Sequence, residues 1–397
     1  MLLGLTDFKV FLFNGTIANA EPKLLFVVND LSYFASHRIE VAKLASSLGY
    51  QIHVVYGGKS LSTSVDGLDA CVRLHHITQK RGQFSPLRDF YFAVKIWFLL
   101  THLRPEIVHT ISLKSVVLCG FALLFVSNVR VVASINGFGS WFAKRKESSN
   151  GVRRHFILWL LSLVLSRSSQ WVIVQNRHDK EIIRNLTVVD DHKLILVPGA
   201  GVNLKTYRRV AECGDVVRIV MASRLLWEKG VREFVEAASV FKRHGREVEF
   251  VLAGEPDPEK ASSVPSVEIE GWVEQGLISY VGFCDDVNKL FADSHIVVLP
   301  SFYGEGLPKI LIEAAACGRP VVTTDVPGCK DAVIHGHTGL LVPALDVDAL
   351  CEALNYLSSN PAIRAQMGIK AREFAEKKFD IASVLDAHRV IYEFKGH

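Results

Sequence analysis

The sequence predicts an α/β protein made of two Rossmann-like domains, each built on a parallel sheet. β-branched apolar runs alternate with helical segments in both halves of the chain, which is typical of buried parallel strands joined by crossover helices. The 397 residues are enough for two separate cores, and the polar run 205–215 looks like a linker between them. We therefore expect an N-terminal extension over 1–22, a first domain over 23–205 and a second over 215–378.

The composition is that of a globular protein, with 49% hydrophobic and 22% charged residues. A net charge of +4 argues against a nucleic-acid-binding protein. None of the seven cysteines forms a C-x-x-C pair, so we expect neither a disulfide framework nor a zinc site, and a reducing compartment. Charged residues interrupt the first apolar stretch, which argues against a signal peptide. The longest uncharged apolar stretches, Ser115–Asn128 and Phe156–Ser166, are shorter than the roughly 18–20 residues that span a bilayer.

The first half begins with a strand over Lys23–Asn29, a helix that ends near Leu48 and a second strand over Gln51–Tyr56. No G-x-G-x-x-G follows the first strand, so a dinucleotide site is not expected there. Further along we expect a helix over 86–103 and strands over 105–110, 129–135 and 170–175. Gly137 and Gly139 come directly after one of these strands, which suggests that the backbone approaches a ligand closely there.

The segment from 143 to 167 has the most unusual composition in the chain. A basic cluster precedes the apolar run Phe156–Leu165, which carries Trp159; its members are Lys144, Arg145, Lys146, Arg153 and Arg154. A cationic patch beside an apolar helix is typical of a segment that lies on anionic lipid headgroups. We therefore expect peripheral contact with an anionic membrane through residues 144–165. The alternative is a helix buried against the sheet after a solvated basic loop.

The second half opens with a strand over Val216–Ala222, and Arg224 and Lys229 follow it before a helix over 232–243. Ligands bind at the carboxyl ends of strands in open α/β sheets. A guanidinium fork and a compact ammonium suit a diphosphate. An isolated arginine and lysine at this spacing ordinarily belong to a solvated loop, so the surrounding sequence has to decide between the two interpretations.

The most informative stretch is Ser301–Ala314, which lies between a strand over 294–300 and a helix that ends at Cys317. The glycines and the proline of its loop let backbone N–H groups and the positive end of the helix approach an anion, which predicts a phosphate site. Glu305 and Glu313 can face the same cleft. Because a phosphate repels a carboxylate, these two side chains fit the site only if they accept hydrogen bonds from hydroxyl groups, such as those of a sugar. The alternative is an ordinary turn with solvated glutamates.

With its flanks, Ser301–Ala314 resembles the E-x7-E signature of the retaining GT-B glycosyltransferases of family 4, and Glu313–Val322 resembles the helix and strand that follow it there. Arg224 and Lys229 resemble the pair that grips the nucleotide diphosphate in that family. The resemblance extends over nearly the whole chain from about Lys23 onward. The first half is most similar to bacterial enzymes that add N-acetylhexosamine to undecaprenyl-diphosphate-linked saccharides.

The resemblance implies a GT-B fold, in which two Rossmann-like domains face a central cleft and a C-terminal helix within 379–397 crosses back to the first domain. It implies that a UDP-sugar binds the second domain and that its sugar is transferred, with retention, to a hydroxyl of a polyprenyl-diphosphate-linked saccharide in surface polysaccharide or glycan assembly. It implies no divalent metal, because two side-chain cations replace it. It also implies a peripheral position on the inner face of a bacterial cytoplasmic membrane.

The resemblance assigns roles to individual residues as well. Arg224 and Lys229 are expected to stabilise the negative charge that grows on the β-phosphate, and Glu305 to hold the donor sugar's hydroxyls. The other expected nucleotide contacts are Gly282 and Phe283 at the base, Gly306, Leu307 and Pro308 at the diphosphate, and Glu313 at the ribose. The expected acceptor side consists of Asn29, His37, Arg38, Asn136 and Gly137, with His109 as an alternative.

Two of the acceptor-side expectations have competing interpretations. His37 and Arg38 could equally cap and solvate the start of a helix. Asn136 stands where many family members have a histidine, so it offers an amide rather than a base. His109 is a lone histidine at a strand end, and such residues are more often structural.

Other functions remain open at this stage. A family 4 enzyme could use a soluble or a different lipid acceptor, or a GDP-sugar donor. A protein of this shape could bind a nucleotide sugar as a regulator without turnover, but the complete set Arg224, Lys229, Glu305 and Glu313 argues against that. A sugar-nucleotide epimerase would release sugar without an acceptor.

Overall fold

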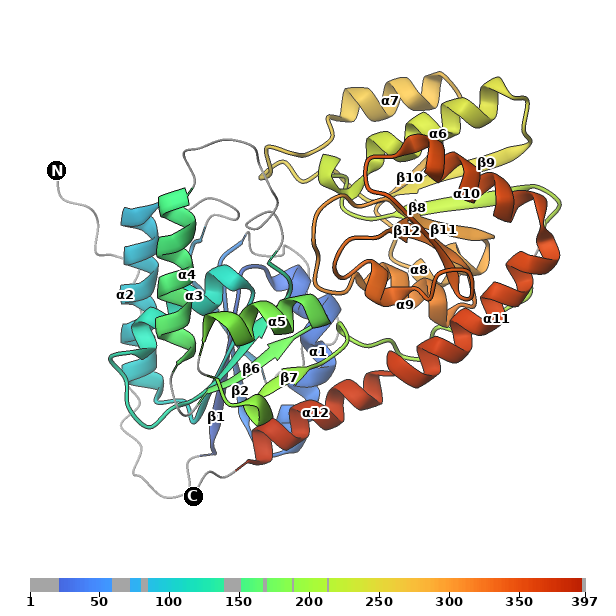
Figure 1. Ribbon diagram of the computed structural model, residues 1–397. Coiled ribbons are helices and arrows are strands. Elements are labelled where there is room, and N and C mark those ends of the chain that lie inside the picture. Colours follow the sequence, from blue (N-terminus) through green and yellow to red (C-terminus); the bar gives the residue numbers. More distant parts are fainter. Residues whose placement is uncertain are drawn as a thin grey trace.

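The computed structural model describes residues 21–58, 72–79, 85–138, 151–166, 170–187, 189–212 and 214–394. Figure 1 shows two halves side by side, each with a sheet between layers of helices. Residues 1–20 of the expected extension and the basic residues 144–146 lie outside the described part of the chain.

The first half contains, within the described residues, a seven-stranded sheet of order β3-β2-β1-β4-β5-β6-β7 in which every neighbouring pair is parallel. Its strands are β1 (Lys23–Val28), β2 (Gln51–Tyr56), β3 (Val72–His76), β4 (Ile107–Ile111), β5 (Arg130–Ile135), β6 (Gln170–Val174) and β7 (Leu194–Leu196). The central strands are buried on both faces, which explains their continuous apolar runs. Because the strands run the same way, the residues that follow β1, β4, β5 and β6 meet at one edge of the sheet.

The second half repeats this design with a six-stranded sheet of order β10-β9-β8-β11-β12-β13. Its strands are β8 (Val217–Ala222), β9 (Val248–Ala253), β10 (Ser279–Gly282), β11 (Ile296–Leu299), β12 (Val321–Thr324) and β13 (Gly339–Val342). All five pairings are parallel. The carboxyl ends of β8 and β11, which are neighbours, therefore bring the segments after residues 222 and 299 together.

Helices cover both faces of each sheet, as in doubly wound folds. In the first half they are α1 (Leu31–Ser47), α2 (Pro86–Leu103), α3 (Leu113–Leu123), α4 (Gly151–Leu165) and α5 (Arg177–Leu186). In the second half they are α6 (Val231–Arg243), α7 (Ser266–Glu274), α8 (Val287–Ala292), α9 (Lys309–Ala316), α10 (Val347–Ser359) and α11 (Pro361–Lys378). Helix α1 packs on one face of the first sheet, and α2, α3 and α4 pack on the other. No helix in the described ranges is long and apolar enough to cross a bilayer.

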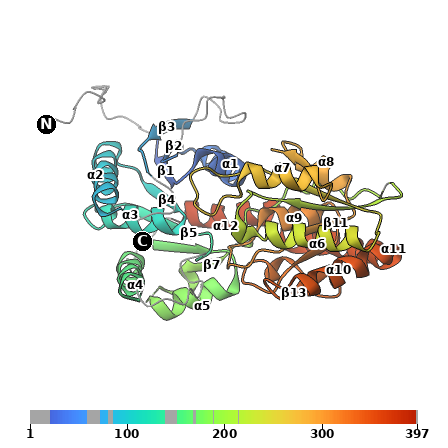
Figure 2. The same cartoon turned by 90° about the horizontal axis from the view of Figure 1, so that it is seen from above.

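The last helix, α12 (Ile381–Glu393), returns to the first half, as the resemblance implied. Asp380 accepts a hydrogen bond from the Ala382 N–H and starts α12 directly after α11 has ended. The side chains of Ile391 and Tyr392 join the core between α1 and the first sheet. Figures 1 and 2 both show α12 lying against the first half.

Most elements begin and end close to where the sequence places them. Strand β3 and helices α3, α7 and α8 were not predicted. Strand β3 pairs with β2 alone at the sheet edge, and its residues Arg73, Leu74 and His76 are exposed, so the segment lacks the apolar run of a central strand.

Candidate active site

The candidate site lies where the carboxyl edges of the two sheets face each other. The loop after β11 is attached to the segment after β8, because Ser301 Oγ and the Phe302 N–H both donate to the Glu228 carbonyl, at 3.1 and 3.2 Å. Gly230, with φ +83°, permits this attachment: a Cβ there would lie 2.2 Å from the Pro300 carbonyl oxygen. The close approach of these two backbones places Lys229 beside the loop that carries Glu305.

Lys229 and Glu305 form an ion pair at the centre of the site, between Nζ and Oε2. Each side chain is only 11% exposed. Burial disfavours the charged form of Lys229, but the Glu305 carboxylate outweighs burial and raises the pKa of the ammonium. The Tyr303 ring lies 5.4 Å from the same ammonium. The other carboxylate oxygen, Oε1, is buried and has no hydrogen-bond partner among the described residues, so Glu305 can still accept a hydroxyl donor.

Arg224 follows β8 and is more open to solvent, with its side chain 54% exposed. Its Nη1 lies 3.3 Å from Asp257 Oδ2. Arg224 and Lys229 both follow β8, next to the end of β11, so the two cations lie at the same edge of the second sheet. The structure thus brings together Arg224, Lys229 and Glu305, as the sequence predicts.

Glu313 lies on α9 and is nearly fully buried. Its Oε1 accepts a hydrogen bond from the Tyr207 hydroxyl at 2.7 Å and lies 3.1 Å from Lys309 Nζ. Burial, followed by the charge of Glu313, raises the pKa of the Tyr207 hydroxyl. Tyr207 comes from the polar segment between the two sheets and was not predicted as a site residue.

The backbone of the loop at 305–308 is largely engaged within the protein. The Leu307 N–H donates to Gln175 Oε1 at 3.0 Å, and the Glu305 N–H donates to the Pro327 carbonyl at 3.1 Å. Pro308 has no N–H to give. Leu307 and Pro308 therefore have no N–H to offer to a phosphate in this structure, and of the three expected residues Gly306 remains a candidate for that contact.

Gly282 and Phe283, the expected base contacts, lie at the end of β10, two strands from β8. The Gly282 carbonyl accepts a hydrogen bond from the Gly254 N–H at 2.7 Å, and the Phe283 side chain is largely exposed. They therefore lie further along the same sheet edge as Arg224.

On the first half, Asn136 is the centre of a hydrogen-bond network. Its Oδ1 accepts from Arg38 Nη2 at 3.2 Å and from Gln175 Nε2 at 3.1 Å, and its Nδ2 donates to the Tyr33 hydroxyl at 2.6 Å. Asn29 lies further along the edge, where its amide is bonded to Ser112 and Ser115 at 2.7 Å each. Both asparagines are thus held in place by the first half itself.

His37 and Arg38 do not cap α1, because Asp30 is the N-cap and both residues lie inside the helix. The His37 ring stacks on Tyr33, with centroids 4.2 Å apart. Burial, together with the charges of Lys309 and Arg38, holds the pKa of His37 well below its ordinary value, so the imidazole is neutral near pH 7. Arg38 is buried, and its Nε has no partner among the described residues. The expectation of a solvated helix start is therefore corrected for Arg38.

His109 lies away from this edge, in the core beneath α12. Its two ring nitrogens are bonded to the Tyr392 hydroxyl and Ser134 Oγ, at 2.7 Å each. Burial, together with His388 and Arg38, holds the pKa of His109 well below its ordinary value. The structure thus gives His109 a place in the core and not one on the acceptor side.

The two halves touch through the backbone at this site. A Cβ added to Gly137, which has φ +98°, would lie 2.5 Å from the Gly306 nitrogen and 2.7 Å from the Glu305 carbonyl carbon. Asn176, at the start of α5, places its Nδ2 3.0 Å from the Glu305 carbonyl oxygen and 3.1 Å from that of Gly306. Lys309 Nζ donates to the Ser36 carbonyl of α1 at 2.9 Å. The expected acceptor side therefore lies directly against the loop that carries Glu305.

Two family models match most of this architecture. The model described as Glycosyltransferase Family 4 matches residues 35–204, and the model described as Glycosyl transferases group 1 matches residues 216–360, so together they span more than half of the chain. The chain belongs to the group 1, family 4 glycosyltransferases.

Individual relatives agree with this assignment. This glycosyltransferase is 26% identical over 305 residues to N,N'-diacetylbacillosaminyl-diphospho-undecaprenol alpha-1,3-N-acetylgalactosaminyltransferase of Campylobacter jejuni, covering 74% of this chain and 77% of that one. It is 24% identical over 341 residues to UDP-Gal:alpha-D-GlcNAc-diphosphoundecaprenol alpha-1,3-galactosyltransferase of Escherichia coli, covering 82% and 85%.

Solved structures establish the GT-B fold of this glycosyltransferase. Sucrose-phosphate synthase of Thermosynechococcus elongatus superposes with a TM-score of 0.76 at 20% identity, over 94% of this chain and 98% of that one. HepE of Anabaena, in complex with UDP-glucose, superposes with a TM-score of 0.71 at 17% identity, over 92% and 98%.

Sequence reasoning missed several residues that this glycosyltransferase places at the site. Gln175, Asn176, Tyr33 and Lys309 contact the groups described above, and Tyr207 reaches Glu313. One signal was available for Gln175 and Asn176. They follow β6 directly, and strand ends at one edge of a parallel sheet are where sites form.

Proposed function

We propose that this glycosyltransferase moves a sugar, N-acetylhexosamine, from a UDP-sugar to a hydroxyl of a polyprenyl-diphosphate-linked saccharide, with retention at the anomeric carbon. The observation that carries the proposal is the buried Lys229–Glu305 pair, in which Glu305 Oε1 keeps an unused acceptor. A sugar hydroxyl supplies the donor that this oxygen lacks, and a diphosphate supplies the negative charge that Lys229 and Arg224 face.

The chemistry follows from the placement of charge. When the bond between the anomeric carbon and the β-phosphate oxygen breaks, negative charge grows on that oxygen. Lys229 and Arg224 stabilise this charge in a site where Lys229 is shielded from water, so the interaction is stronger than it would be in solution. Two side-chain cations at this place perform the task that a divalent metal performs in other transferases, so we propose that the reaction needs no metal.

The acceptor enters from the first half in this proposal. Asn136, Gly137, His37 and Asn29 lie along the facing edge, and Gly137 touches the Glu305 backbone. The neutral His37 ring is a hydrogen-bonding group rather than a cation near pH 7. Departing phosphate is proposed to take the acceptor's proton, although attack on a covalent intermediate at a carboxylate also leads to retention.

The proposed donor and acceptor are supported by what the relatives are named for. One superposed structure holds UDP-glucose, and the Escherichia coli relative is named for a UDP-sugar donor. Both relatives described above are named for acceptors linked to undecaprenol through a diphosphate.

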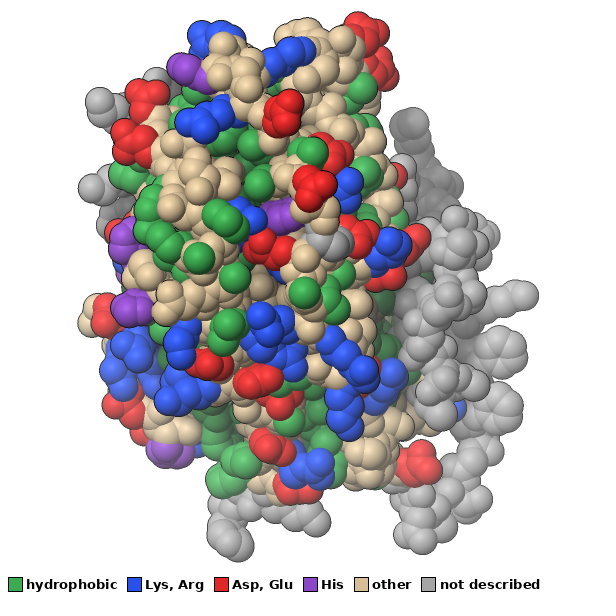
Figure 3. Space-filling model, turned by 90° about the vertical axis from the view of Figure 1, so that its right-hand side faces the viewer, with side chains coloured by type: hydrophobic (Ala, Val, Ile, Leu, Met, Phe, Trp, Pro, Cys, Tyr) green, Lys and Arg blue, Asp and Glu red, His purple; other side chains and the backbone are tan. Residues whose placement is uncertain are grey.

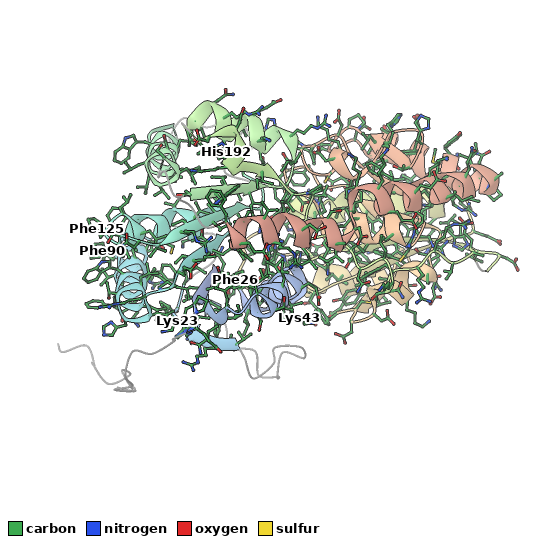
Figure 4. The ribbon with its side chains drawn as sticks, turned by 90° about the horizontal axis from the view of Figure 1, so that it is seen from below. Lys23, Phe26, Lys43, Phe90, Phe125 and His192 are labelled. Carbon is green, nitrogen blue, oxygen red and sulfur yellow. The ribbon has the colours of Figure 1, made fainter. Side chains whose placement is uncertain are left out.

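An exposed apolar surface on the first half supports the proposed membrane contact. Helices α2 and α4 and the end of α3 with the residues directly after it carry large apolar side chains that face outward, and the most exposed are Leu87, Phe90, Tyr91, Phe125 and Trp159. Figure 4 shows Phe90 and Phe125 projecting from the same end of the molecule. The face of the second half in Figure 3 instead carries basic and acidic side chains side by side. We propose that the apolar end lies on the inner face of a bacterial cytoplasmic membrane, with contact through residues 144–165 as the sequence analysis expects.

The experiment that tests the proposal is transfer from a panel of radiolabelled UDP- and GDP-sugars to extracted polyprenyl-diphosphate-linked saccharides, with EDTA present. We expect butanol-extractable label from one UDP-N-acetylhexosamine. Label only in a water-soluble product would overturn the lipid-linked acceptor, and label from a GDP-sugar would overturn the donor. Release of free sugar without any acceptor would indicate an epimerase-like reaction instead.

The membrane contact is tested separately by flotation with vesicles that contain anionic lipid. Replacing Phe125 with serine is expected to weaken flotation. The matched control is Tyr356→Ser, which removes an exposed aromatic side chain from α10 on the second half. Equal flotation of both variants and the unmodified protein would contradict the proposed surface.

A further inference from the structure

Two consecutive amide side chains of the first half, those of Gln175 and Asn176, form hydrogen bonds to the loop at 305–308, which carries Glu305 in the second half. Gln175 Oε1 accepts the Leu307 N–H at 3.0 Å, and Asn176 Nδ2 lies 3.0 and 3.1 Å from the carbonyl oxygens of Glu305 and Gly306. Each of the peptide groups on both sides of Gly306 is therefore held from the opposite half.

The amides themselves are fixed by the first half. Gln175 Nε2 donates to Asn136 Oδ1 at 3.1 Å, and Asn176 Oδ1 accepts from the Asp179 N–H at 2.8 Å as the N-cap of α5. Asn176 Nδ2 also lies 2.9 Å from Asp179 Oδ2. Both amide side chains are buried. The loop therefore contacts two amide groups that other hydrogen bonds of the first half already hold in place.

Glycines allow this contact to be made by backbone atoms. A Cβ on Gly306 would lie 2.1 Å from Gln175 Oε1 and 2.8 Å from the Asn136 carbonyl oxygen. On the other side of the loop, a Cβ on Gly328 would lie 2.1 Å from the Gly306 carbonyl oxygen and 2.5 Å from that of Glu305. The Glu305–Gly306 peptide is thus enclosed between the two halves.

We propose that Gln175 and Asn176 are positioning residues, which set the direction of the Glu305 side chain only while the two halves are in contact. Among the described residues, the backbone of 305–307 has one hydrogen bond of its own to the second half, from the Glu305 N–H to the Pro327 carbonyl, and the Glu305 side chain is held there by Lys229. If the halves separate, the bonds to Leu307, Glu305 and Gly306 are exchanged for water. Closure of the halves then completes the site at the moment when donor and acceptor are brought together.

The kinetic consequence rests on the proposed transfer activity, whereas the structural consequence does not. Of the proposed donor contacts, Glu305 and Gly306 lie on the loop that the two amides hold. Those that bind the diphosphate and the ribose through side chains, Arg224, Lys229 and Glu313, belong to the second half and do not depend on Gln175 or Asn176. Loss of either amide should therefore lower kcat and leave the donor KM almost unchanged. A misdirected carboxylate in the closed state should cost about 10- to 100-fold in kcat.

The structural test is hydrogen–deuterium exchange at single-residue resolution, with the full-length protein and no substrate. In Gln175→Met the Leu307 N–H loses its acceptor and should exchange at least about 10-fold faster. The Glu305 N–H, which is bonded within the second half, is the internal reference and should not change. Gln175→Glu keeps the acceptor oxygen at Oε1 but loses the Nε2 donor to Asn136 Oδ1, so it should retain much, though not all, of the protection of Leu307.

Asn176 is tested with Asn176→Asp, which keeps the oxygen that caps α5 and removes the N–H donor to the loop. The matched control is Asn360→Asp, the same change at the N-cap position of α11, where Asn360 donates to the Tyr356 carbonyl instead. We expect a fall in kcat at constant donor KM for Asn176→Asp and Gln175→Met, near-normal values for Asn360→Asp, and substantial recovery in Gln175→Glu.

The outcomes separate this inference from the proposed function. Unchanged Leu307 exchange in Gln175→Met, or an equal loss of protection in Gln175→Glu, would overturn the inference whatever the activity. If Gln175→Met does not fold, Gln175→Glu and Asn176→Asp still decide. If no nucleotide sugar is turned over by the unmodified protein, the proposed function fails, but faster exchange at Leu307 in Gln175→Met would still support the contact.

Discussion

Replacing Glu305 with glutamine should destabilise the second half, because it leaves the Lys229 ammonium buried without its counter-charge. Both side chains are 11% exposed, so little solvent is available to compensate. Removing one partner of a buried ion pair costs about 3–5 kcal/mol. The loss has an upper limit, because Lys229 can instead give up its proton, which from an ordinary pKa of about 10.4 costs about 4 kcal/mol at pH 7.5.

The expected loss is therefore about 3–4 kcal/mol, which corresponds to a fall in Tm of about 6–16 °C for a unit of this size. Differential scanning calorimetry in a buffer without phosphate measures it. UDP should raise the Tm of Glu305→Gln more than that of the unmodified protein, because the diphosphate replaces the missing negative charge. The double variant Lys229→Met with Glu305→Gln removes both charges and should recover most of the stability while remaining inactive.

A control ion pair shows what burial contributes. Lys370 Nζ lies 2.8 Å from Glu373 Oε2, but both side chains are about half exposed. Glu373→Gln should therefore change the free energy of unfolding by less than about 1 kcal/mol. A Tm for Glu305→Gln as close to the unmodified value as that of Glu373→Gln would refute the reasoning. It would mean that the pair at the site is not shielded from water.

Three further predictions follow from single contacts. Burial raises the pKa of Asp179 to about 7. The stability contributed by its protonated form is therefore complete below the ordinary pKa of an aspartate and is lost as the pH rises through about 7. In calorimetric scans, Asp179→Asn should raise the Tm at about pH 8 and flatten the profile of Tm against pH from about pH 5 to 8. Gly328→Ala should lower the Tm and the turnover much more than Gly336→Ala does. Both glycines have positive φ, but an added Cβ would collide with the Gly306 carbonyl only at Gly328, whereas open space surrounds Gly336. Equal effects of the two changes would exclude this collision as the cause. Tyr207→Phe should cost about 1–3 kcal/mol in thermal unfolding, because the buried Glu313 carboxylate loses a donor.

The sequence was a sufficient guide to the part of the site that a single sheet builds. Arg224, Lys229 and Glu305 follow β8 and β11, and these strands are neighbours in a parallel sheet, so their ends must meet. Glu313 lies on the helix that follows the second of them. The family resemblance singled these residues out, and the strand order of one sheet places all four without any contribution from the first half.

The residues that the sequence did not identify depend on how the halves are placed relative to each other. Gln175 and Asn176 contact Leu307, Glu305 and Gly306, which are more than a hundred residues away in the chain. An amide at a strand end has no periodicity that distinguishes it from a loop residue. A contact between two halves that each fold around their own sheet therefore leaves no local sequence pattern from which it could be predicted.

Burial was the second property that local pattern did not report. Arg38 was a candidate for the acceptor side through the family resemblance, and His109 was an alternative whose structural interpretation stayed open. The C-terminal helix α12 covers this part of the first sheet, and Tyr392 on that helix supplies the hydrogen-bond partner of His109. The buried position of His109 and its hydrogen bonding thus depend on a residue 283 positions further along the chain.

The partners of the site residues indicate how a nucleotide sugar would bind. Lys229 is paired with Glu305, Arg224 with Asp257, and Glu313 with Tyr207. Binding at these side chains is therefore an exchange of one charge-assisted contact for another, and only the difference between the two contributes to affinity. The same pairing keeps the site folded and its charges compensated before a donor arrives. In the proposed mechanism such an exchange adds little affinity in the ground state, and most of the interaction energy of Lys229 and Arg224 is released when charge grows on the leaving phosphate, where it accelerates transfer.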